Sequence, residues 1–432
     1  MKKPVVITLL VAAFLFVLAG IGVTLFFIFG TGGGTIGLTR NPFHATAEEN
    51  KTLNVKGPIT LKVRDDAGEV TIVSGKAEDK VLVKVIKTGS AFTQAGAEQE
   101  LKNIKYEIKQ DGDTVTLTYK IDNLEFDNTV NTVDFIVTVP AETTVDVKTN
   151  LGAVSVSDTI GNLNIVNDFG DVTLKNIDGG VIVETQSGKV DASSISAREE
   201  TIKLDSGFGT VSLEKASGKD ITLTSSSGAL EISDVRASGA VTMSTDFGDV
   251  RFNKGSANSL TIDTNSGKIT LEALTLKEGL TAKSEFGDIN LEQVKAVSYN
   301  LETNSGSVAV DGANGKVKVR SGFGSLTVKN ADSATLDLDT QSGDVEFEGS
   351  LGDGPHTVRT DFGAIKLTLP ADSALNVDLA TDFGKITSDI PITVVLSGDT
   401  EKSHQTGTMN GGGAQLTVET QSGDISIQAT NR

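Results

Sequence analysis

Acidic residues beside glycines are the strongest candidates for a chemical site in this sequence. The pairs are Asp168 and Asp171, Asp246 and Asp249, and Glu285 and Asp288. Carboxylate oxygens that converge at a turn are ligands that Ca²⁺ prefers. The alternative is a solvated edge on which Asp249, Lys268 and Asp288 balance charge across neighbouring strands. The chain also lacks the nonapeptide of calcium-binding β-rolls. We predict no required metal or cofactor, with calcium at Asp246, Asp249, Glu285 and Asp288 as the weaker hypothesis.

Side chains for covalent and acid–base catalysis are few and scattered. The sequence has no Cys, which excludes disulfides, thiolate metal sites and a Cys nucleophile. His44, His356 and His404 stand alone, without a Ser or Cys nucleophile motif nearby. The triplet Asp168-Phe169-Gly170 matches a kinase metal-binding motif, but the other kinase motifs are absent. We therefore predict no catalytic residues and no enzymatic activity.

The charge balance limits the partners of the chain. Asp and Glu number 57 against 38 Lys and Arg, which gives a formal net charge of −19. A surface this acidic repels phosphate backbones, so we predict no nucleic-acid partner.

The N-terminus carries an apolar segment long enough to cross a membrane. Residues 5–29 contain no charge and would span about 37 Å as a helix. Lys2 and Lys3 precede this segment, which favours a cytoplasmic N-terminus and an extracytoplasmic remainder. A cleaved signal peptide is the alternative, but the residues after Val17-Leu18-Ala19 are too apolar for a cleavage region. We predict a transmembrane anchor at residues 1–30 in the cell membrane, single-pass, and a Gly-rich linker at 31–50.

A short phrase centred on glycine recurs along most of the chain. The glycines are Gly152, Gly170, Gly188, Gly209, Gly228, Gly248, Gly267, Gly287, Gly306, Gly324, Gly343, Gly363, Gly384 and Gly423. Their gaps are 18 to 21 residues, except for a last gap of 39 that hides a degenerate turn or an inserted loop. Apolar residues recur two positions after and five positions before each glycine, which indicates strand, corner, strand. We predict an all-β parallel β-solenoid of about 19–20 residues per coil.

Two further columns of the repeat are polar or mixed. Three residues before each glycine stands Thr, Ser or, once, Asn. This position is an even number of residues from the apolar column that precedes the glycine, so its side chains should point inward. We predict that these hydroxyls bond to each other or to the backbone of the corner. The alternative, an outward threonine array as in ice-binding solenoids, would need the opposite direction. The residue directly before glycine alternates between Phe and Ser, which we interpret as large and small side chains packing in successive coils. Phe and Ser corners on opposite edges would instead indicate one wide coil.

The two ends of the repeat look different from its middle. Residues 51–140 are predicted to form a strand-rich N-terminal cap that includes a first coil at Asp66–Ile72. Within it we expect a helix near Thr93–Ile104, a hairpin over Tyr106–Lys120 and a strand at Val133–Val139. Residues 141–432 form the solenoid, with a polar loop at 397–413 and a last coil at 415–428 that closes the rod.

Three stretches together resemble a bacterial family of proposed adhesins of unknown function built as repetitive β-solenoids. They are VDFIVTVP at Val133–Pro140, the repeated Thr-x-Ser-Gly-x-Val phrase as at Thr340–Val345, and GTMNGGGAQLTVETQSGDISI at Gly407–Ile427. The resemblance covers about residues 50 to 430. It implies an adhesin-like role and supplies no catalytic residues.

These observations lead to one functional expectation and two alternatives. The first is a membrane-anchored, extracytoplasmic solenoid that acts as an adhesin-like or structural surface protein, held by residues 5–29, with surface polysaccharide or protein as its partner. The second is an envelope sensor or an accessory subunit of a membrane complex. The third, which the absence of Trp and the scarcity of Tyr disfavour, is a polysaccharide-active β-helix enzyme.

Overall fold

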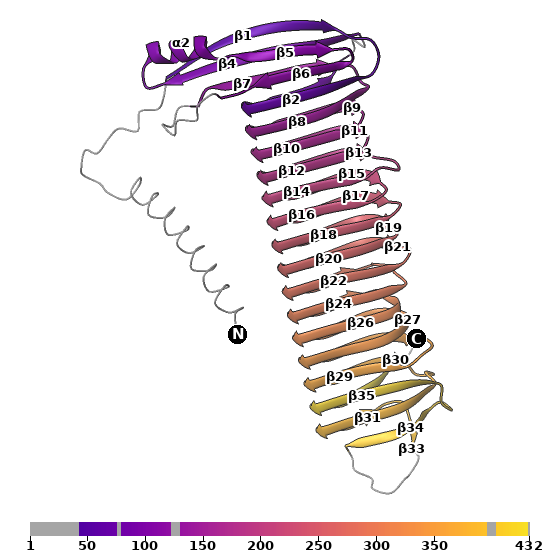
Figure 1. Cartoon of the computed structure of the whole chain (residues 1–432). Helices are drawn as coiled ribbons and strands as arrows, with labels where there is room; N and C mark the ends of the chain where they lie inside the picture. The colour runs from indigo at the N-terminus through magenta and orange to yellow at the C-terminus, as the bar shows by residue number, and fades with distance from the viewer. Residues whose placement is uncertain (1–42, 76–78, 122–129, 395–402, 431–432) are drawn as a thin grey trace, which may run out of the picture.

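The computed structural model describes residues 43–75, 79–121, 130–394 and 403–430. The expected membrane-spanning segment, residues 5–29, lies outside these described residues. Among the residues that are described, no helix is long and apolar enough to cross a membrane. Most of the chain forms a long rod of stacked strands with a wider cap at its N-terminal end (Figure 1).

Each coil of the rod consists of two strands and two corners. In one coil β10 (Leu163–Phe169) leads through Gly170 into β11 (Val172–Asp178), and Gly179 turns the chain into the next coil. β10 pairs in parallel, residue for residue, with β8 on one side and β12 on the other. β11 pairs in the same way with β9 and β13. This arrangement confirms the parallel β-solenoid.

The strands before the corner glycines form the first sheet, and the strands after them form the second. In spatial order the first sheet contains β2 (Ile59–Ala67), β8 (Thr143–Leu151), β10, β12 (Val181–Ser187), β14 (Ile202–Phe208), β16 (Ile221–Ser227), β18 (Ala240–Phe247), β20 (Ser259–Ser266), β22 (Gly279–Phe286), β24 (Ser298–Ser305), β26 (Asn314–Phe323), the second half of β27 (Leu326–Ser342), β29 (His356–Phe362), β35 (Ala414–Ser422) and β31 (Leu375–Phe383). The second sheet contains β3 (Val70–Ser74), β9 (Val154–Ile160), β11, β13 (Val190–Ser196), β15 (Val211–Gly218), β17 (Leu230–Ala237), β19 (Val250–Ala257), β21 (Ile269–Leu276), β23 (Ile289–Glu292), β25 (Val308–Asp311), the first half of β27, β28 (Val345–Leu351), β30 (Ile365–Pro370), β36 (Ile425–Thr430) and β32 (Ile386–Ser388).

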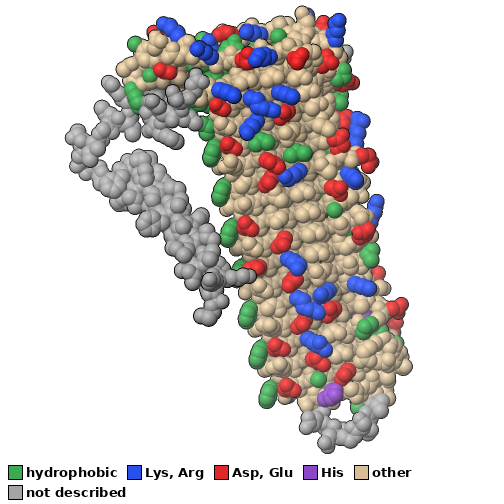
Figure 2. Space-filling view, in the orientation of Figure 1, with side chains coloured by type: hydrophobic (Ala, Val, Ile, Leu, Met, Phe, Trp, Pro, Cys, Tyr) green, Lys and Arg blue, Asp and Glu red, His purple; other side chains and the backbone are tan. Residues whose placement is uncertain are grey.

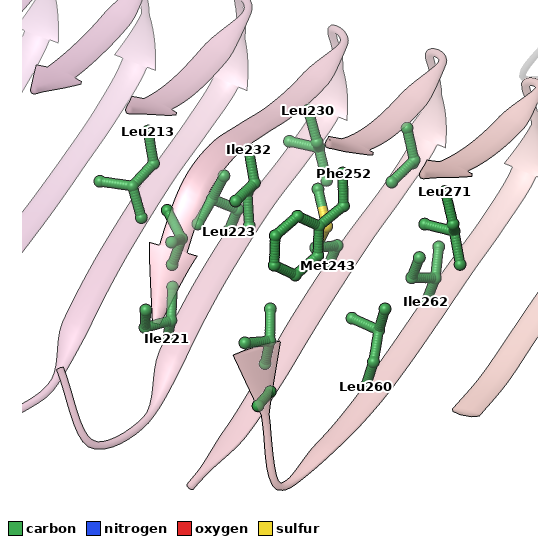
Figure 3. Close-up of a cluster of buried hydrophobic side chains, with 14 of the residues drawn as sticks. Leu213, Ile221, Leu223, Leu230, Ile232, Met243, Phe252, Leu260, Ile262 and Leu271 are labelled. Atoms are coloured by element: carbon green, nitrogen blue, oxygen red, sulfur yellow. The ribbon is translucent and has the colours of Figure 1, made fainter. Parts of the chain in front are cut away.

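The core is a single apolar layer between the two sheets. Side chains of a strand alternate in direction, so every second residue of each sheet points inward. Ile221 and Leu223 of the first sheet face Leu230 and Ile232 of the second, and all four are buried (Figure 3). The same pattern repeats in each coil, so the core extends along the whole rod.

A column of glycines runs down one edge, and close approach of the backbone explains it. A Cβ built on each of these glycines would lie 1.9–2.3 Å from a backbone carbonyl oxygen, which for all but the first is that of the preceding glycine in the stack. No real Cβ tolerates such a contact, so only glycine fits. In spatial order the column is Gly68, Gly152, Gly170, Gly188, Gly209, Gly228, Gly248, Gly267, Gly287, Gly306, Gly324, Gly343, Gly363, Gly423 and Gly384.

The polar column three residues before each glycine points inward, as predicted. Its hydroxyls donate to the carbonyl oxygen of the corner glycine one coil earlier, over 2.9–3.2 Å. The donors are Ser206, Ser225, Thr245, Ser284, Thr303, Ser321, Thr340, Thr360, Thr381 and Thr420. Asn167 bridges two such carbonyls, those of Gly152 and Gly170. The ladder therefore ties adjacent corners together.

A second bend lies inside the strands of the second sheet. Six residues after most corner glycines stands a non-glycine residue with φ between 51° and 60°, such as Asp158, Asn176 and Asn330. The left-handed conformation bends the strand toward the second corner, and Asn and Asp tolerate it better than most residues do.

The N-terminal cap places the first coil inside the stack. β2 lies between β6 (Thr114–Tyr119) and β8, and β3 lies between β7 (Thr132–Val139) and β9. Three antiparallel pairings continue outward: β5 (Tyr106–Asp111) on β6, β4 (Lys80–Ala91) on β7, and β1 (Phe43–Asn54) on β4. Helix α2 (Gln94–Asn103) packs on β4 and β1. Residues 43–50 belong to β1, although the sequence analysis places them in the linker.

The C-terminal coil does not close the rod. β35 lies between β29 and β31, and β36 lies between β30 and β32. The last coil in sequence is therefore the last but one in space. The end is covered by β33 (Ile392–Val394) and β34 (His404–Met409), where β34 pairs antiparallel with both β31 and β33. The gap of 39 residues thus holds an inserted hairpin, after which the chain returns to the inner layer.

Candidate ligand-binding ridge

Seven phenylalanines form an exposed column on the edge of the rod. They are Phe169, Phe208, Phe247, Phe286, Phe323, Phe362 and Phe383, and their exposed fractions run from 53% to 80%. Each stands directly before a corner glycine, at the end of a strand of the first sheet. The space-filling view shows apolar side chains at regular intervals along this edge (Figure 2). We call these seven side chains and the serines between them the Phe ridge.

Phe and Ser alternate strictly along the ridge in space. Phe169 is in register with Ser187, Ser187 with Phe208, and the pattern continues to Phe362. In sequence, Phe362 and Phe383 break the alternation, because two Phe corners follow one another. The inserted strand β35 restores it, since Ser422 pairs with both Phe362 and Phe383. Phe and Ser share one edge, which confirms two stacked coils.

The expectation that Phe and Ser pack the corner in turn is wrong. The parity of the strand suggests an inward side chain, but β10 stops alternating at its end: Asn167 is buried, Asp168 is half-buried and Phe169 is exposed. The chain is already turning toward Gly170 at this point, so the ring swings onto the outer edge. The rings are therefore surface groups that recur at regular intervals along the edge.

Carboxylates and amides flank the ridge on one side. Asp168, Asp246, Glu285, Asp361 and Asp382 directly precede five of the rings. In the Ser coils between them the same position holds uncharged residues, and two of these donate to the carboxylates: Gln186 Nε2 to Asp168 at 3.0 Å and Asn265 Nδ2 to Asp246 at 3.2 Å. No Lys or Arg occupies this column from residue 150 to 421. The flank therefore offers acceptors and negative charge.

The outer face of the first sheet is hydroxyl-rich beside the middle of the ridge. Thr222, Thr242, Thr261 and Thr281 occupy one outward position in four successive coils, and each is at least partly exposed. Within the described structure, their side-chain hydroxyls make no hydrogen bond to protein. This stretch is uncharged along that column, whereas ion pairs dominate the face farther along the rod.

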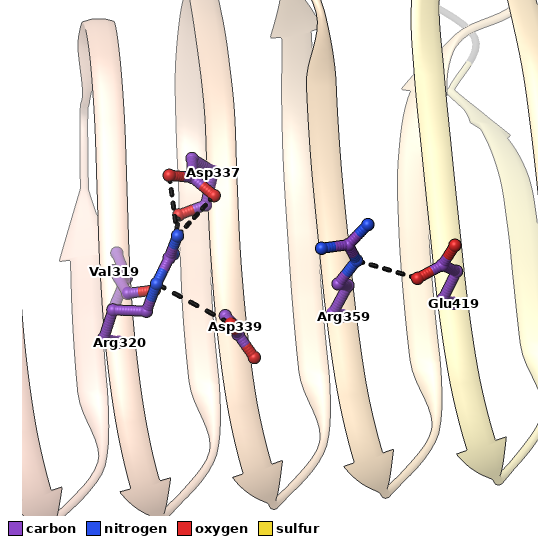
Figure 4. Close-up of polar contacts among 6 residues, drawn as sticks. All are labelled: Val319, Arg320, Asp337, Asp339, Arg359 and Glu419. Atoms are coloured by element: carbon purple, nitrogen blue, oxygen red, sulfur yellow. Dashed lines mark hydrogen bonds and ion pairs between the residues drawn. The ribbon is translucent and has the colours of Figure 1, made fainter.

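Cross-strand ion pairs cover the same face toward the C-terminal end. Arg320 donates to both carboxylate oxygens of Asp337, at 2.7 and 2.8 Å, and lies 3.7 Å from Asp339 (Figure 4). Arg359 donates to Glu419 over 2.8 Å. These side chains are about one-third to one-half exposed, so each pair adds little stability. Arg359 and Glu419 also line a shallow pocket of about 240 Å³ together with Asp361 and Asp382.

The four carboxylates of the calcium hypothesis do not converge. Asp246 and Asp249 lie two coils from Glu285 and Asp288, a separation of roughly 10 Å. Asp249 accepts the backbone N–H of Lys268 at 3.0 Å, and Asp288 accepts that of Ser307 at 2.8 Å. Over the described ranges, no group of three or more His, Asp or Glu side chains is arranged to hold a metal ion. Two of the four carboxylates thus brace the corners, and calcium binding here stays a hypothesis.

The three histidines serve structure in three different settings. His356 is fully buried: its Nδ1 accepts the N–H of Leu336 at 3.3 Å, and its Nε2 lies 3.0 Å from Gly352 O. Burial lowers the pKa of His356, which keeps the ring neutral. His404 lies 2.8 Å from Asp378 on the surface, and His44 bonds to Ser90.

One cavity of about 540 Å³ opens in the N-terminal cap, lined in part by Glu100, Lys105, Tyr106 and Tyr119. Burial and a hydrogen bond to Glu49 raise the pKa of Tyr106 to about 12, which removes its phenol from acid–base chemistry near neutral pH. The cavity adds no catalytic pair to the residues discussed above.

Sequence reasoning identified the Phe and Ser positions but missed their exposure. The signal was present in the neighbouring residue: acidic side chains stand before five of the seven rings, and a charged residue next to a ring is unusual for a packed corner. A second signal concerned the order of the coils. The alternation of Phe and Ser breaks at Phe383, which marks the place where β35 is inserted in space.

Comparison with known proteins identifies the family of the chain and adds little beyond it. No curated protein matches this sequence. Two crystal structures are similar in part: a proposed cell adhesion protein from Clostridium sporogenes is 12% identical, covers 89% of this chain and all of its own, and has a TM-score of 0.16. A proposed adhesin from Bacteroides fragilis is 13% identical, covers 65% of this chain and 96% of its own, and has a TM-score of 0.24. Superpositions this poor carry no argument about function.

The family assignment rests on a sequence match over nearly the whole rod. The Toastrack DUF4097 family model matches residues 60–254 and again residues 250–428. The two matches together include both sheets, the glycine column and every ring of the Phe ridge. The chain is a member of the Toastrack DUF4097 family.

Proposed function

We propose that this protein is a non-enzymatic, adhesin-like binding rod, anchored in the cell membrane by residues 5–29 and projecting outward, that holds its ligand along the Phe ridge. The exposed ridge is the observation that supports this proposal. Seven rings on one edge form a regular row of exposed apolar groups, and exposed apolar surface of this kind marks interaction sites. The long polar faces of the described part of the chain fit binding better than chemistry.

The ridge suits weak contacts repeated many times. Covering the exposed half of one phenylalanine ring contributes about 1 kcal/mol. A ligand that engages several rings at once gains affinity through multivalency, because each further contact forms within one complex. A rod that binds in this way needs length more than a deep site.

The test compares adhesion of the ectodomain with and without central rings. The protein is residues 43–432, and the variant is Phe208→Ser, Phe247→Ser and Phe286→Ser combined. Serine occupies the same position in the alternate coils, so the fold accepts it. The matched control replaces three exposed apolar residues away from the ridge: Ile160→Ser, Ile182→Ser and Val297→Ser. Retention on intact bacterial cells is measured by sedimentation.

We expect the ridge variant to lose most of its retention and the control to keep it. Equal retention of both variants would contradict a role for the ridge. If the unaltered ectodomain is not retained on the cells at all, the adhesin hypothesis fails, and the alternative of an accessory subunit of a membrane complex takes its place.

A separate measurement tests the anchor. The chain of residues 1–432 should sediment with membranes and be digested by protease added to intact spheroplasts, whereas residues 43–432 expressed alone should stay in the soluble fraction. A full-length chain found in the soluble fraction would contradict anchoring by residues 5–29.

A further inference from the structure

We infer that the ligand of the Phe ridge is a linear, uncharged β-1,4-linked polysaccharide that lies along the rod with one sugar ring on each phenylalanine. This inference rests on the proposed function and names the ligand class of the same site. It is carried by the spacing of the rings and by the charge around them.

The spacing of the rings matches the repeat of such a polymer. Successive rings are two coils apart, which is roughly 10 Å at the usual distance between paired strands. In an extended β-1,4-linked chain each sugar is turned by about half a revolution from its neighbour, so every second sugar presents the same face. The repeat is one disaccharide, close in length to two coils. Rings on every second coil therefore meet the same face of every second sugar.

The chemistry of the ridge suits a sugar at both positions of the repeat. The apolar face of a pyranose presents C–H groups to the electron-rich face of an aromatic ring. The intervening sugar lies over a serine such as Ser227 or Ser266, which is too small to push it away and offers a hydroxyl. The carboxylates of Asp246 and Glu285 beside the rings accept hydrogen bonds from sugar hydroxyls.

Charge argues against four other occupants. The chain carries a net charge of −19, and five of its carboxylates flank the ridge without a cation in the same column. Nucleic acids, acidic polysaccharides and an anionic membrane surface are repelled. A second copy docked ridge to ridge would bring the same carboxylates together. The ridge therefore excludes acidic partners and admits an uncharged one.

The length of the ridge argues against a globular protein. A standard interface buries about 800 Å² on each partner, which a few coils supply. The ridge instead repeats one unit from Phe169 to Phe383, and the strand insertion at β35 extends the same alternation to the end of the rod. A partner that uses every unit has to be a polymer with the same repeat.

The experiment measures binding of the ectodomain, residues 43–432, to cellohexaose and chitohexaose by isothermal titration calorimetry, with maltohexaose as the control. A hexamer contains three disaccharides and reaches three rings. Maltohexaose contains the same number of sugars but curves because of its α-1,4 linkage. We expect binding to a β-1,4-linked hexamer, weaker binding to its dimer, and at least tenfold weaker binding to maltohexaose.

Two variants separate register from apolar area. Phe247→Ser combined with Phe323→Ser leaves no three consecutive rings for a hexamer, and we expect at least a tenfold loss of affinity. Ser266→Phe adds a ring between Phe247 and Phe286, which increases the apolar area but blocks the intervening sugar, so we expect fewer hexamers bound per rod and no gain in affinity. Circular dichroism checks that both variants keep the fold.

Three results would overturn the inference: no binding of either β-1,4-linked hexamer, equal binding of maltohexaose, or tighter binding by the Ser266→Phe variant. If cell retention still depends on Phe208, Phe247 and Phe286 while these glycans fail to bind, the proposed function stands and the ligand belongs to another class. If retention does not depend on the rings, the proposed function itself fails.

Discussion

At the scale of single residues, the buried hydroxyls and the corner glycines act as one unit. Most glycine carbonyls at the corners accept a hydroxyl from the next coil, because no Cβ keeps the two coils apart there. The unit has exceptions: Thr149, Thr185 and Thr264 are buried and have a hydroxyl without a hydrogen-bond partner. These exceptions allow the contribution of this hydrogen bond to the free energy of unfolding to be measured within one protein.

Thr303→Val should destabilise the rod more than Thr264→Val does. Thr303 donates to Gly287 O at 3.1 Å, and removing the donor leaves a buried carbonyl without its bond, at a cost of about 1–2 kcal/mol. Thr264 is equally buried but donates to nothing, so a methyl group in place of its hydroxyl should be neutral or slightly stabilising. Urea denaturation followed by circular dichroism compares the two, and equal losses would contradict the role of the bond.

Asp65 occupies the ladder position in the first coil, where the other coils have Thr, Ser or Asn. It is 2% exposed, its Oδ1 accepts the N–H of Ala67 at 3.2 Å, and its Oδ2 has no partner. Burial, together with the nearby charges of Asp134 and Asp66, raises the pKa of Asp65 to about 8, although the N–H of Ala67 opposes the shift. The carboxyl is therefore protonated at neutral pH in the folded chain.

This raised pKa predicts a pH dependence of stability. The unfolded Asp ionises near pH 3.9, so the contribution of Asp65 is fully present below about pH 4. Above that pH it falls by up to about 1.4 kcal/mol per unit until the pH passes about 8. Asp65→Asn, which copies Asn167 of the ladder, removes this loss. The stability gained by the variant should grow from pH 5 to pH 8 in urea denaturation, and a gain that is constant with pH would refute the assignment.

At the scale of elements, both ends of the rod use the same device. The chain forms one coil, then the outer strands of the cap or hairpin, and then the coil that packs on the inner side of the first. At the N-terminal end β2 and β3 are enclosed by later strands, and at the C-terminal end β35 enters between β29 and β31. Coils of nearly identical sequence make this possible, because each coil fits against any other.

Disulfide cross-linking tests the spatial order of the last three coils. The native chain has no cysteine, so introduced pairs report without background. Arg359→Cys with Glu419→Cys should form a disulfide, because these residues are neighbours in register across β29 and β35. Arg359→Cys with Ala380→Cys should not, because β35 separates the two strands by about two strand spacings. Mass spectrometry after oxidation would show the reverse result if the coils stacked in sequence order.

At the scale of the whole molecule, antiparallel strands stop the sheets from growing. The exposed strand edges at either end of the rod would otherwise pair with the edges of another copy of the chain. β1, β4 and β5 cover the N-terminal end, and the hairpin of β33 and β34 covers β31 at the other. The rod is thereby kept to one length.

Removing the C-terminal hairpin should therefore cause self-association. Replacing residues 391–412 with a short Gly-Ser linker exposes the edge of β31, and we expect dimers that join end to end. The control shortens only residues 395–402 and keeps β33 and β34. Size-exclusion chromatography with light scattering gives the mass, and a monomeric hairpin deletion would contradict the capping role.

The sequence by itself determined the repeat, its parallel stacking and its inward ladder. These features follow from local rules: alternation sets which side chains point inward, and a corner with no room for a Cβ admits only glycine. The helix near Gln94–Asn103 and the hairpin around Gly112 were readable for the same reason, because a helix N-cap such as Thr93 and a tight turn are local signals.

Only the tertiary structure decided the order of the coils and the exposure of the phenylalanines. Coils that share one apolar pattern fit against one another in any order, so only the break in the Phe and Ser alternation at Phe383 hints that β35 lies between β29 and β31. Strand parity likewise predicts Phe247 inside the rod, yet its side chain is 63% exposed, because the backbone leaves the strand path one residue before the glycine. The ridge, which we propose as the functional surface, exists because of that turn.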